Sequence, residues 1–473
     1  MNTHIVIATL GILTLLSFPT IAAQAAETWP PPSFTVRWDP APLPTYEGAE
    51  EPNPARYLAP DDPVPVWQAY EVSPGEEPRL LYETPRFLED VNWEPDGTTV
   101  RIGTSSLVQP RSKYDIPHDI AGFTRIDLRS RAAEALLTQG NWPKVSPDGR
   151  NVALSLGGQT YLRQPGKPDR KLATDGKSAP FFGWTPDSRS ILIWYPDPDV
   201  WPSRTGAVYL VPLEDGEARY LATMPDKPAW SHDGGRLAYI ADGDVYVYDL
   251  AGRYSRRLAH GDTYLGGPPE WSEDDSMLIA RGDVIDVASG KVLASLFDGE
   301  VVSRNLSPDG RYFAATDYAG GYTSSTARCP SRPPQNHLVV HDLLTGTTRT
   351  IHDCGGTIWH AGSAVLAGSN RLDRAVVSRR DCSNPDCRDS TSYLEILTLQ
   401  DGATVEMGAA SGTVSPDHHA LLVSGSVLKV FSRDLELIRE IPIPDGKRVS
   451  SVGWAPDSQR FVYVVGPEKL IAQ

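Results

Sequence analysis

One short motif recurs along the chain and constrains its fold more than any other feature. Clear copies are V-S-P-D-G at 145–149, W-T-P-D-S at 184–188 and W-S-H-D-G at 230–234. In such a motif Pro presets the first corner of a type I turn, Asp bonds its own backbone, and Gly accepts the left-handed position that follows. Short alternating apolar segments flank each copy, so each copy predicts a β-hairpin. Eight copies carry the Asp, at positions 96, 148, 187, 233, 274, 309, 417 and 457.

The spacing of the copies predicts how the hairpins are assembled. Neighbouring copies lie 35 to 52 residues apart, except for one gap of 108 residues that holds a degenerate copy at 363–380. Two more strands follow most hairpins, as at 244–250 and 255–259. Four strands in about 40 to 45 residues are typical of a propeller blade. We predict an all-β chain with one β-propeller of eight four-stranded blades, with nine or seven blades as alternatives.

The last blade is expected to be built from both ends of the chain. Only two strand-like segments, 461–465 and 469–472, follow Asp457. Residues 67–72 and 79–83 also have strand patterns. We expect these N-terminal strands to complete the last blade and close the ring, which hides otherwise open sheet edges.

The N-terminal region differs from the repeats. Residues 5–23 are almost wholly apolar and lead into Ala23-Gln24-Ala25, so residues 1–25 are predicted to be a signal peptide of a periplasmic or secreted protein. Residues 1–4, ahead of this apolar stretch, contain no Lys or Arg, which leaves an uncleaved membrane anchor as the alternative. Residues 29–65 contain eleven Pro. We therefore expect a Pro-rich linker or surface strap at 26–65 that does not pair in a sheet, with partner binding as the alternative, and a propeller at 66–473.

Charge and cysteine content restrict the partners and the compartment. The chain has 44 Lys and Arg against 60 Asp and Glu, a net charge of −16, and no basic run, which argues against nucleic acid. In an exported chain four Cys favour disulfides. One possible connectivity has two disulfides, Cys382–Cys387 and Cys329–Cys354, and other pairings remain open. A zinc site is the competing interpretation, disfavoured because C-x₂-C spacing is absent.

The hairpin motif carries a family resemblance over residues 66–473. Its W-S-P-D-G character is similar to the repeat of TolB-type propellers and to the propeller domain of prolyl oligopeptidase-like serine peptidases. The TolB resemblance implies partner binding in the periplasm. TolB proteins carry an α/β domain before a six-bladed propeller, and neither feature fits here, so the chain is expected to be TolB-like only. The peptidases need a G-x-S-x-G nucleophile elbow, which this sequence lacks.

Four long insertions indicate where a partner would bind. They lie at 104–121, 196–205, 319–336 and 381–391, each between the second and third strand of a predicted blade. Such connections emerge on one side of a propeller, and clustered insertions on a repeat protein often mark its binding side. These loops combine aromatic and acidic side chains, and exposed aromatic side chains often anchor interfaces. The candidate binding residues are Tyr195, Asp197, Asp199, Trp201, Tyr318 and Tyr322. The alternative is that the aromatic residues pack only within their own loops.

Two other residue sets are assigned structural roles. The tryptophans at equivalent motif positions are expected in the core, namely Trp93, Trp184, Trp230, Trp271 and Trp454. His337 and His341 share one face of a predicted strand but stand about 13 Å apart, too far to bind one metal ion. Asp197 and Asp199 are oxygen ligands suited to Ca²⁺, but the sequence offers no further ligands.

These observations favour a binding protein over an enzyme. The sequence predicts no catalytic residue, cofactor or metal site. We expect an exported, non-catalytic binding or scaffold protein with a protein or glycan partner in the cell envelope, and no membrane span after signal removal. The alternative is a propeller-type enzyme, a hydrolase or lyase acting on glycans or peptides. Such an enzyme would gather at least three titratable groups at the central channel.

Overall fold

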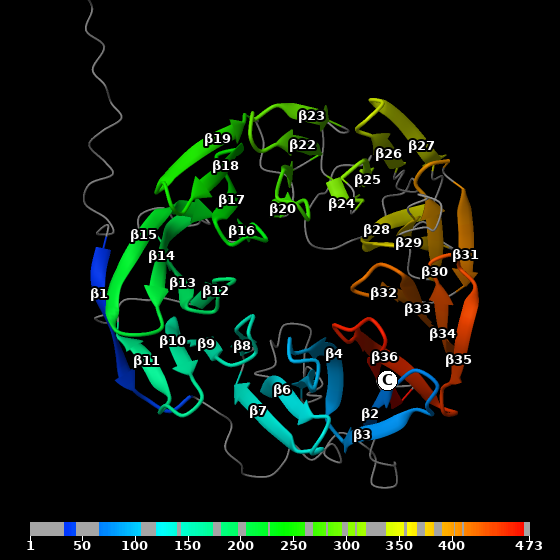
Figure 1. Cartoon of the computed structure of the whole chain (residues 1–473), viewed down its shortest axis with the longest axis horizontal. Coiled ribbons are helices and arrows are strands. Elements are labelled where there is room, and N and C mark those ends of the chain that lie inside the picture. Colours follow the sequence, from blue (N-terminus) through cyan, green and yellow to red (C-terminus); the bar gives the residue numbers. More distant parts are fainter. Residues whose placement is uncertain are drawn as a thin grey trace, which may run out of the picture.

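The described part of the chain consists of short β-strands and turns arranged in a ring (Figure 1). The computed structural model describes residues 33–43, 66–105, 120–139, 143–173, 181–196, 205–225, 228–260, 268–280, 282–295, 301–307, 310–317, 337–353, 357–366, 374–382, 390–401, 403–408 and 411–467. Within these ranges there are 37 strands and no helix, an all-β architecture compatible with a β-propeller. Among the same residues no helix is long and apolar enough to cross a membrane.

Apart from β1, the described strands form nine groups of four, numbered 1 to 9 along the chain from β4. In each group the first strand lies nearest the axis of the ring and the last lies at the rim (Figure 1). Group 1 contains β4 (Phe87–Trp93), β5 (Thr99–Ser105), β6 (Ile120–Asp127) and β7 (Ala133–Gln139); group 2 contains β8 (Lys144–Val145), β9 (Val152–Leu156), β10 (Gln159–Arg163) and β11 (Arg170–Ala173); group 3 contains β12 (Phe181–Trp184), β13 (Ser190–Pro196), β14 (Thr205–Pro212) and β15 (Gly216–Pro225).

The next five groups continue in the same order. Group 4 contains β16 (Ala229–Trp230), β17 (Arg236–Ala241), β18 (Asp244–Asp249) and β19 (Tyr254–Ala259); group 5 contains β20 (Glu270–Trp271), β21 (Met277–Ala280), β22 (Asp283–Asp286) and β23 (Val292–Ser295). Group 6 contains β24 (Val301–Leu306), β25 (Tyr312–Asp317), β26 (His337–Asp342) and β27 (Thr347–Asp353); group 7 contains β28 (Thr357–Leu366), β29 (Arg374–Cys382), β30 (Ser390–Thr398) and β31 (Thr404–Gly408); group 8 contains β32 (Ser411–Val414), β33 (Ala420–Ser424), β34 (Val427–Ser432) and β35 (Leu437–Pro442).

Group 9 joins the two ends of the chain, as expected, while the strand expected at 469–472 lies outside the described residues. Its inner strands are β36 (Lys447–Trp454) and β37 (Phe461–Pro467), and its outer strands are β2 (Trp67–Val72) and β3 (Arg79–Thr84). Strand β2 pairs with β37 in antiparallel register from Gln68 opposite Val465 to Val72 opposite Phe461. The side chains agree with this pairing, because Tyr70 stacks on Tyr463 with ring centroids 5.2 Å apart.

The recurring motif forms the hairpin between the first and second strand, as predicted. In group 2 the carboxylate of Asp148 accepts hydrogen bonds from Ser146 Oγ (2.5 Å) and Arg150 N (3.0 Å). In group 3 Asp187 accepts the same two bonds from Thr185 Oγ1 (2.6 Å) and Arg189 N (3.0 Å). The motif therefore folds locally, because one Asp side chain satisfies the polar groups of its own turn.

One segment contradicts the expectation that residues 26–65 do not pair in a sheet. Strand β1 (Ser33–Pro40) joins the outer strands of groups 2 and 3 into a nine-stranded sheet. Its first half pairs with β15 and its second half with β11, both antiparallel. Val36 and Trp38 are buried while Arg37 between them is exposed, the alternation of a half-buried strand. No Pro lies between Pro32 and Pro40, so the backbone N–H groups needed for pairing are present.

The apolar core lies between neighbouring groups. One cluster joins groups 9 and 1 through Trp67, Leu88 and Ile102, and another joins groups 8 and 9 through Leu422 and Phe461. The motif tryptophans lie at these boundaries: Trp184 is buried, and Trp93, Trp230, Trp271 and Trp454 are partly buried against the clusters. The expectation of core positions is thus correct for Trp184 and only partly correct for the other four.

Candidate functional site

The ring has two ends that differ in structure. At the turn end, a motif hairpin connects the first and second strand of every group except group 7, whose turn at 367–373 lies outside the described residues. At the insertion end, the second strand connects to the third. The gaps between β5 and β6, β13 and β14, β25 and β26, and β29 and β30 hold the four long insertions, in the connection where the sequence placed them.

Indole groups join neighbouring groups near the turn end. Each donates its Nε1–H to a backbone carbonyl on the first strand of the preceding group. The four bonds are Trp93 to Gly453 (2.8 Å), Trp184 to Lys144 (3.2 Å), Trp271 to Ala229 (3.0 Å) and Trp454 to Thr413 (3.3 Å). The motif Trp therefore fixes the spacing of adjacent groups as well as contributing apolar surface.

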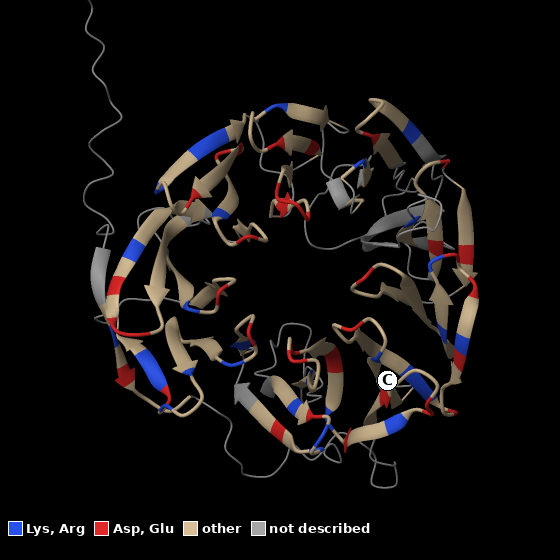
Figure 2. Ribbon diagram, viewed as in Figure 1, with Lys and Arg blue, Asp and Glu red and all other residues tan. Residues whose placement is uncertain are grey.

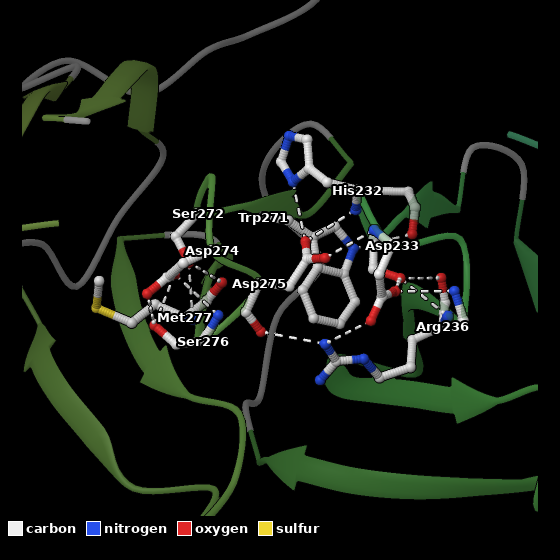
Figure 3. A network of polar contacts seen from close by, with 12 residues as sticks. His232, Asp233, Arg236, Trp271, Ser272, Asp274, Asp275, Ser276 and Met277 are labelled. Atoms are coloured by element: carbon white, nitrogen blue, oxygen red, sulfur yellow. Dashed lines mark hydrogen bonds and ion pairs between the residues drawn. The ribbon is translucent and has the colours of Figure 1, made fainter. Parts of the chain in front are cut away.

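The residue after the motif Asp joins the turns to one another. Asp275 of group 5 accepts hydrogen bonds from the backbone of group 4, at His232 N (2.8 Å) and Asp233 N (2.9 Å), and it also contacts His232 Nδ1 (Figure 3). Ser188 accepts the N–H of Asp148, and Ser458 accepts the N–H of Asp417, both at 3.0 Å. All three residues have positive φ, which favours Gly or Asn. Their side chains explain why Gly is absent, since each satisfies a donor of the preceding turn.

Where the same position is Gly, the preceding turn fills the space. A Cβ on Gly149 would lie 3.0 Å from Glu94 Oε2, and one on Gly234 would lie 3.3 Å from Pro186 Cβ. Both glycines have positive φ, at 75° and 69°. In groups 2 and 4 the preceding turn therefore lies against the glycine, whereas at Gly97 of group 1 the nearest atom to such a Cβ would be 3.7 Å away.

An arginine three residues after the Asp completes the contact in two groups. Arg236 lies 4.9 Å from the ring centroid of Trp271, and Arg460 lies 5.1 Å from that of Trp93 (Figure 3 shows the first). Arg460 also donates to the backbone carbonyl of Gly97 at 2.7 Å. The cation therefore covers the indole of the next group and binds its turn.

The turn end is acidic, but its motif carboxylates are engaged within the fold. Figure 2 shows Asp and Glu at the hairpins nearest the axis. Hydrogen bonds from Ser231 and Gly235 lower the pKa of Asp233, and hydrogen bonds from Ser272 and Ser276 lower that of Asp274. Carboxylates stabilised in the ionised form are poorly suited to general acid chemistry near neutral pH.

One ion pair at this end joins groups that are not neighbours. His418 Nε2 of group 8 lies 3.3 Å from Glu273 Oε1 of group 5. Both belong to motif hairpins, and the His side chain is 32% exposed. Within the described ranges no three His, Cys, Asp or Glu side chains gather in a way that could hold a metal ion.

A small cleft lies between groups 8 and 9. It encloses about 130 Å³ and is lined by Ser411, Gly412, Thr413, Leu422, Ser424, Val449, Ser450, Ser451 and Val452. Ser411 and Ser424 are Cα partners at the ends of β32 and β33 that point away from the turn, and their hydroxyl oxygens lie 2.6 Å apart. The cleft is therefore built from the innermost strands toward the insertion end.

A small side chain helps to account for the cleft. Counted from the motif Asp, Ser424 of group 8 corresponds to Trp194 of group 3. Trp194 packs against the cluster that joins groups 3 and 4. The indole therefore occupies space toward the following group that Ser424 leaves open.

The lining of the cleft is hydroxylic and uncharged. Ser450 and Ser451 are partly engaged by group 1, because Ser450 Oγ donates to Leu88 O at 3.1 Å and Ser451 Oγ accepts from Val91 N at 3.1 Å. Val449, Val452 and Leu422 supply apolar surface. None of the nine lining residues is titratable, so the cleft itself offers groups for binding but none for acid–base catalysis.

Most residues singled out from the sequence fall outside the described ranges. Tyr195 lies on β13 and Cys382 is the last residue of β29, and the structure describes their backbones only. The others outside the described residues are Asp197, Asp199, Trp201, Tyr318, Tyr322, Cys329, Cys354 and Cys387. Their roles in binding and in disulfides stay predictions.

His337 and His341, which the sequence placed on one predicted strand, both belong to β26. His341 is buried, with Nδ1 2.8 Å from Thr348 Oγ1, and burial lowers its pKa.

Sequence reasoning missed the cleft altogether. A signal existed in S-G-T at 411–413, a run of small side chains on β32, the first strand of group 8.

Comparisons with known proteins bear on the fold alone. No protein-family model matches the chain, and no curated protein sequence matches it. The dihydro-heme d1 dehydrogenase NirN is 17% identical over 90% of this chain and 80% of that chain, with a TM-score of 0.41. The putative TolB from Agrobacterium tumefaciens is 16% identical over 85% of this chain and 98% of that chain, with a TM-score of 0.28.

A prolyl endopeptidase is similar at the same low level. It is 14% identical over 74% of this chain and 55% of that chain, with a TM-score of 0.39. TM-scores of this size support no statement about activity or partners. The resemblance of the hairpin repeat to TolB-type proteins therefore stays an expectation, because no family model matches it.

Proposed function

We propose that the chain is an exported β-propeller of nine blades that binds a protein or glycan partner of the cell envelope at its insertion end, without catalysis. Nine is the alternative that the sequence left beside eight. It is supported by the nine groups of four strands in the described residues. The additional group is group 7, whose β28 and β29 include most of the degenerate copy at 363–380.

The placement of the insertions carries the proposal. Four insertions occupy the same connection in four different groups, so equivalent strand ends direct them to one end of the ring. They contain or directly follow the aromatic and acidic residues singled out from the sequence, including Trp201, Tyr318 and Tyr322. Aromatic side chains in exposed loops are the usual anchors of an interface. The uncharged cleft between groups 8 and 9 lies toward the same end.

Catalysis is the second candidate. A propeller enzyme would need convergent titratable groups on the axis. The pair His418 and Glu273 is the nearest such arrangement in the described part of the chain, and it joins two turns at the end opposite the insertions. The binding proposal is favoured because the cleft at the insertion end has no titratable lining.

Capture experiments test the proposal. The full chain is used as bait against an envelope fraction, beside a triple variant with Trp201→Ala, Tyr318→Ala and Tyr322→Ala. The matched control is Tyr254→Ala, which removes an aromatic side chain that is 57% exposed on outer strand β19. We expect a partner that is retained by the wild type and the control and lost by the triple variant. Equal retention by all three would contradict binding through the insertions.

A second measurement tests export. Mass spectrometry of the protein from fractionated cells should find a mature N-terminus after Ala25 in the periplasm or the medium. Recovery of chains in the cytosol that retain residues 1–25 would contradict this part of the proposal.

A further inference from the structure

We propose that the cleft between groups 8 and 9 binds one neutral sugar unit. This inference rests on the proposed function, since it assigns a ligand class to a cleft at the insertion end. The ligand would be a terminal or branching pyranose of a glycan. The cleft is lined by β32 and β36, the innermost strands of groups 8 and 9, and by β33, the second strand of group 8.

The hydroxyl groups of the cleft match those of a sugar. Ser411, Thr413 and Ser424 each offer one O–H donor and two acceptor lone pairs. A pyranose presents hydroxyls with the same dual capacity, so each contact can be satisfied in either direction. The bond between Ser411 Oγ and Ser424 Oγ uses one donor and leaves acceptor lone pairs on both oxygens.

The apolar part of the lining suits the other surface of the same ligand. Val449 and Val452 line the cleft from β36, and Leu422 lines it from β33 with 1% of its surface exposed. A pyranose has C–H groups between its hydroxyls, and burying them against aliphatic side chains contributes a hydrophobic term. A site with both kinds of surface distinguishes a sugar ring from a simple ion or from an alkyl chain.

Size and charge narrow the ligand further. Pockets for drug-sized ligands enclose roughly 300 to 1,000 Å³, and this cleft encloses about 130 Å³, which suits a single ring. None of its nine lining residues carries a charge. A uronic acid would have to bury its carboxylate there without a cation to pair with it, which is unfavourable. The cleft therefore selects a neutral sugar.

Group 3 shows that the repeat does not require such a cleft. Its residue at the position of Ser424 is Trp194, which packs toward group 4. Group 8 lies in the same ring with the same hairpin, in which Ser415 Oγ donates to Asp417 at 2.5 Å. The fold thus tolerates an indole at the position of Ser424, and a variant that restores it is a direct test.

Saturation-transfer NMR with the full chain tests the inference. The probes are the methyl glycosides of glucose, galactose and mannose, with sodium glucuronate as the charged comparison. We expect at least one neutral glycoside to bind and glucuronate to bind at least tenfold more weakly. Thr413→Val removes one hydroxyl at nearly constant shape and should weaken binding about fivefold, the loss expected for one hydrogen bond. Ser424→Trp should abolish it.

Thr404→Val is the matched control, because Thr404 is exposed on outer strand β31, which does not line the cleft, and this variant should leave binding unchanged. If Ser424→Trp fails to fold, judged by circular dichroism and urea unfolding, Thr413→Val decides the outcome. Absence of binding by every neutral glycoside, so that the cleft holds water only, would overturn the inference. Wild-type affinity in both cleft variants would overturn it as well.

The two proposals fail in different ways. If no glycoside binds while the triple aromatic variant still loses its envelope partner, the cleft inference falls and the binding function stands. If a glycoside binds in the cleft while the triple variant keeps its partner, the cleft inference stands and binding through the insertions falls.

Discussion

Strand β1 should contribute measurably to stability, and Trp38 is the residue that shows it best. Its side chain is 5% exposed within the cluster of groups 2 and 3. Its Nε1 donates to Pro212 O at 3.1 Å, and the guanidinium of Arg170 lies 5.4 Å from its ring centroid. Trp38→Ala removes these contacts and leaves a cavity at the junction of β11, β1 and β15.

The expected loss follows from burial and hydrogen bonding. Burying a Trp removes roughly 150 to 250 Å² from water, worth about 4 to 6 kcal/mol at about 25 cal/mol per Å² as an upper bound. Measured Trp→Ala substitutions in cores cost about 3 to 5 kcal/mol. The loss cannot exceed the free energy with which β1 docks, because a larger loss would detach the strand while the groups remain folded. We expect a decrease of about 3 to 5 kcal/mol in the free energy of unfolding.

Urea unfolding and hydrogen exchange measure this effect together. Arg37→Ala is the matched control, because Arg37 lies on the same strand with a side chain that is 72% exposed, and surface substitutions change stability by about 0.5 kcal/mol or less. Trp38→Ala should also speed amide exchange in β11, where Leu172 lies opposite Trp38. Equal stability of the two variants, with unchanged exchange in β11, would refute the assigned role of β1.

Three further substitutions test the contacts between groups. Arg460→Ala should cost about 1 to 3 kcal/mol by urea unfolding, because its bond to Gly97 O and its contact with Trp93 are lost; a cost no larger than that of Arg433→Ala, an exposed pair, would contradict this. Asp275→Gly should cost about 1 to 3 kcal/mol, since two charge-assisted bonds outweigh the relief of a positive φ of 57°; a stabilised variant would disprove the capping role. Asp342→Asn should lose about 1 to 2 kcal/mol at neutral pH, because the hydrogen bond from Arg311 lowers the pKa of Asp342 from 3.8 to about 2. That stability is present above the unfolded pKa and is lost as pH falls from about 4 towards 2. The free energies of unfolding of the wild type and the variant, measured in urea, should therefore converge near pH 2. A difference between them that persists at pH 2 would contradict the assignment.

The hairpins were predictable because their chemistry is local. Ser146, Asp148 and Gly149 satisfy one another within five residues, so the sequence motif determines the turn. The completion of the last group by β2 was also predictable, since the last blade lacked an outer strand at one end of the chain and two strand-like segments were spare at the other. The contacts between turns were not, because they join residues about 40 positions apart, such as Asp148 and Ser188.

Other features were missed for different physical reasons. The density of Pro in 29–65 concealed β1, although Val36 and Trp38 alternate with Arg37 in a strand pattern free of Pro. Group 7 lacks a motif Asp-Gly or Asp-Ser pair, so the sequence identified it only as a degenerate copy and left eight and nine blades as alternatives. The cleft depends in part on Ser424, which is small relative to its equivalent Trp194 in group 3, a difference visible only when the copies are compared position by position.

Ring closure by both ends of the chain is tested most directly by native-state hydrogen exchange in β2 and β37. If β2 holds the ring closed, its amides exchange only when the ring opens, and the pairs from Gln68 and Val465 to Val72 and Phe461 share one opening free energy. We predict equal protection of the two strands, together with simultaneous loss in urea. Exchange of β2 at a much lower opening free energy than β37 would contradict closure of the ring by the N-terminal strands.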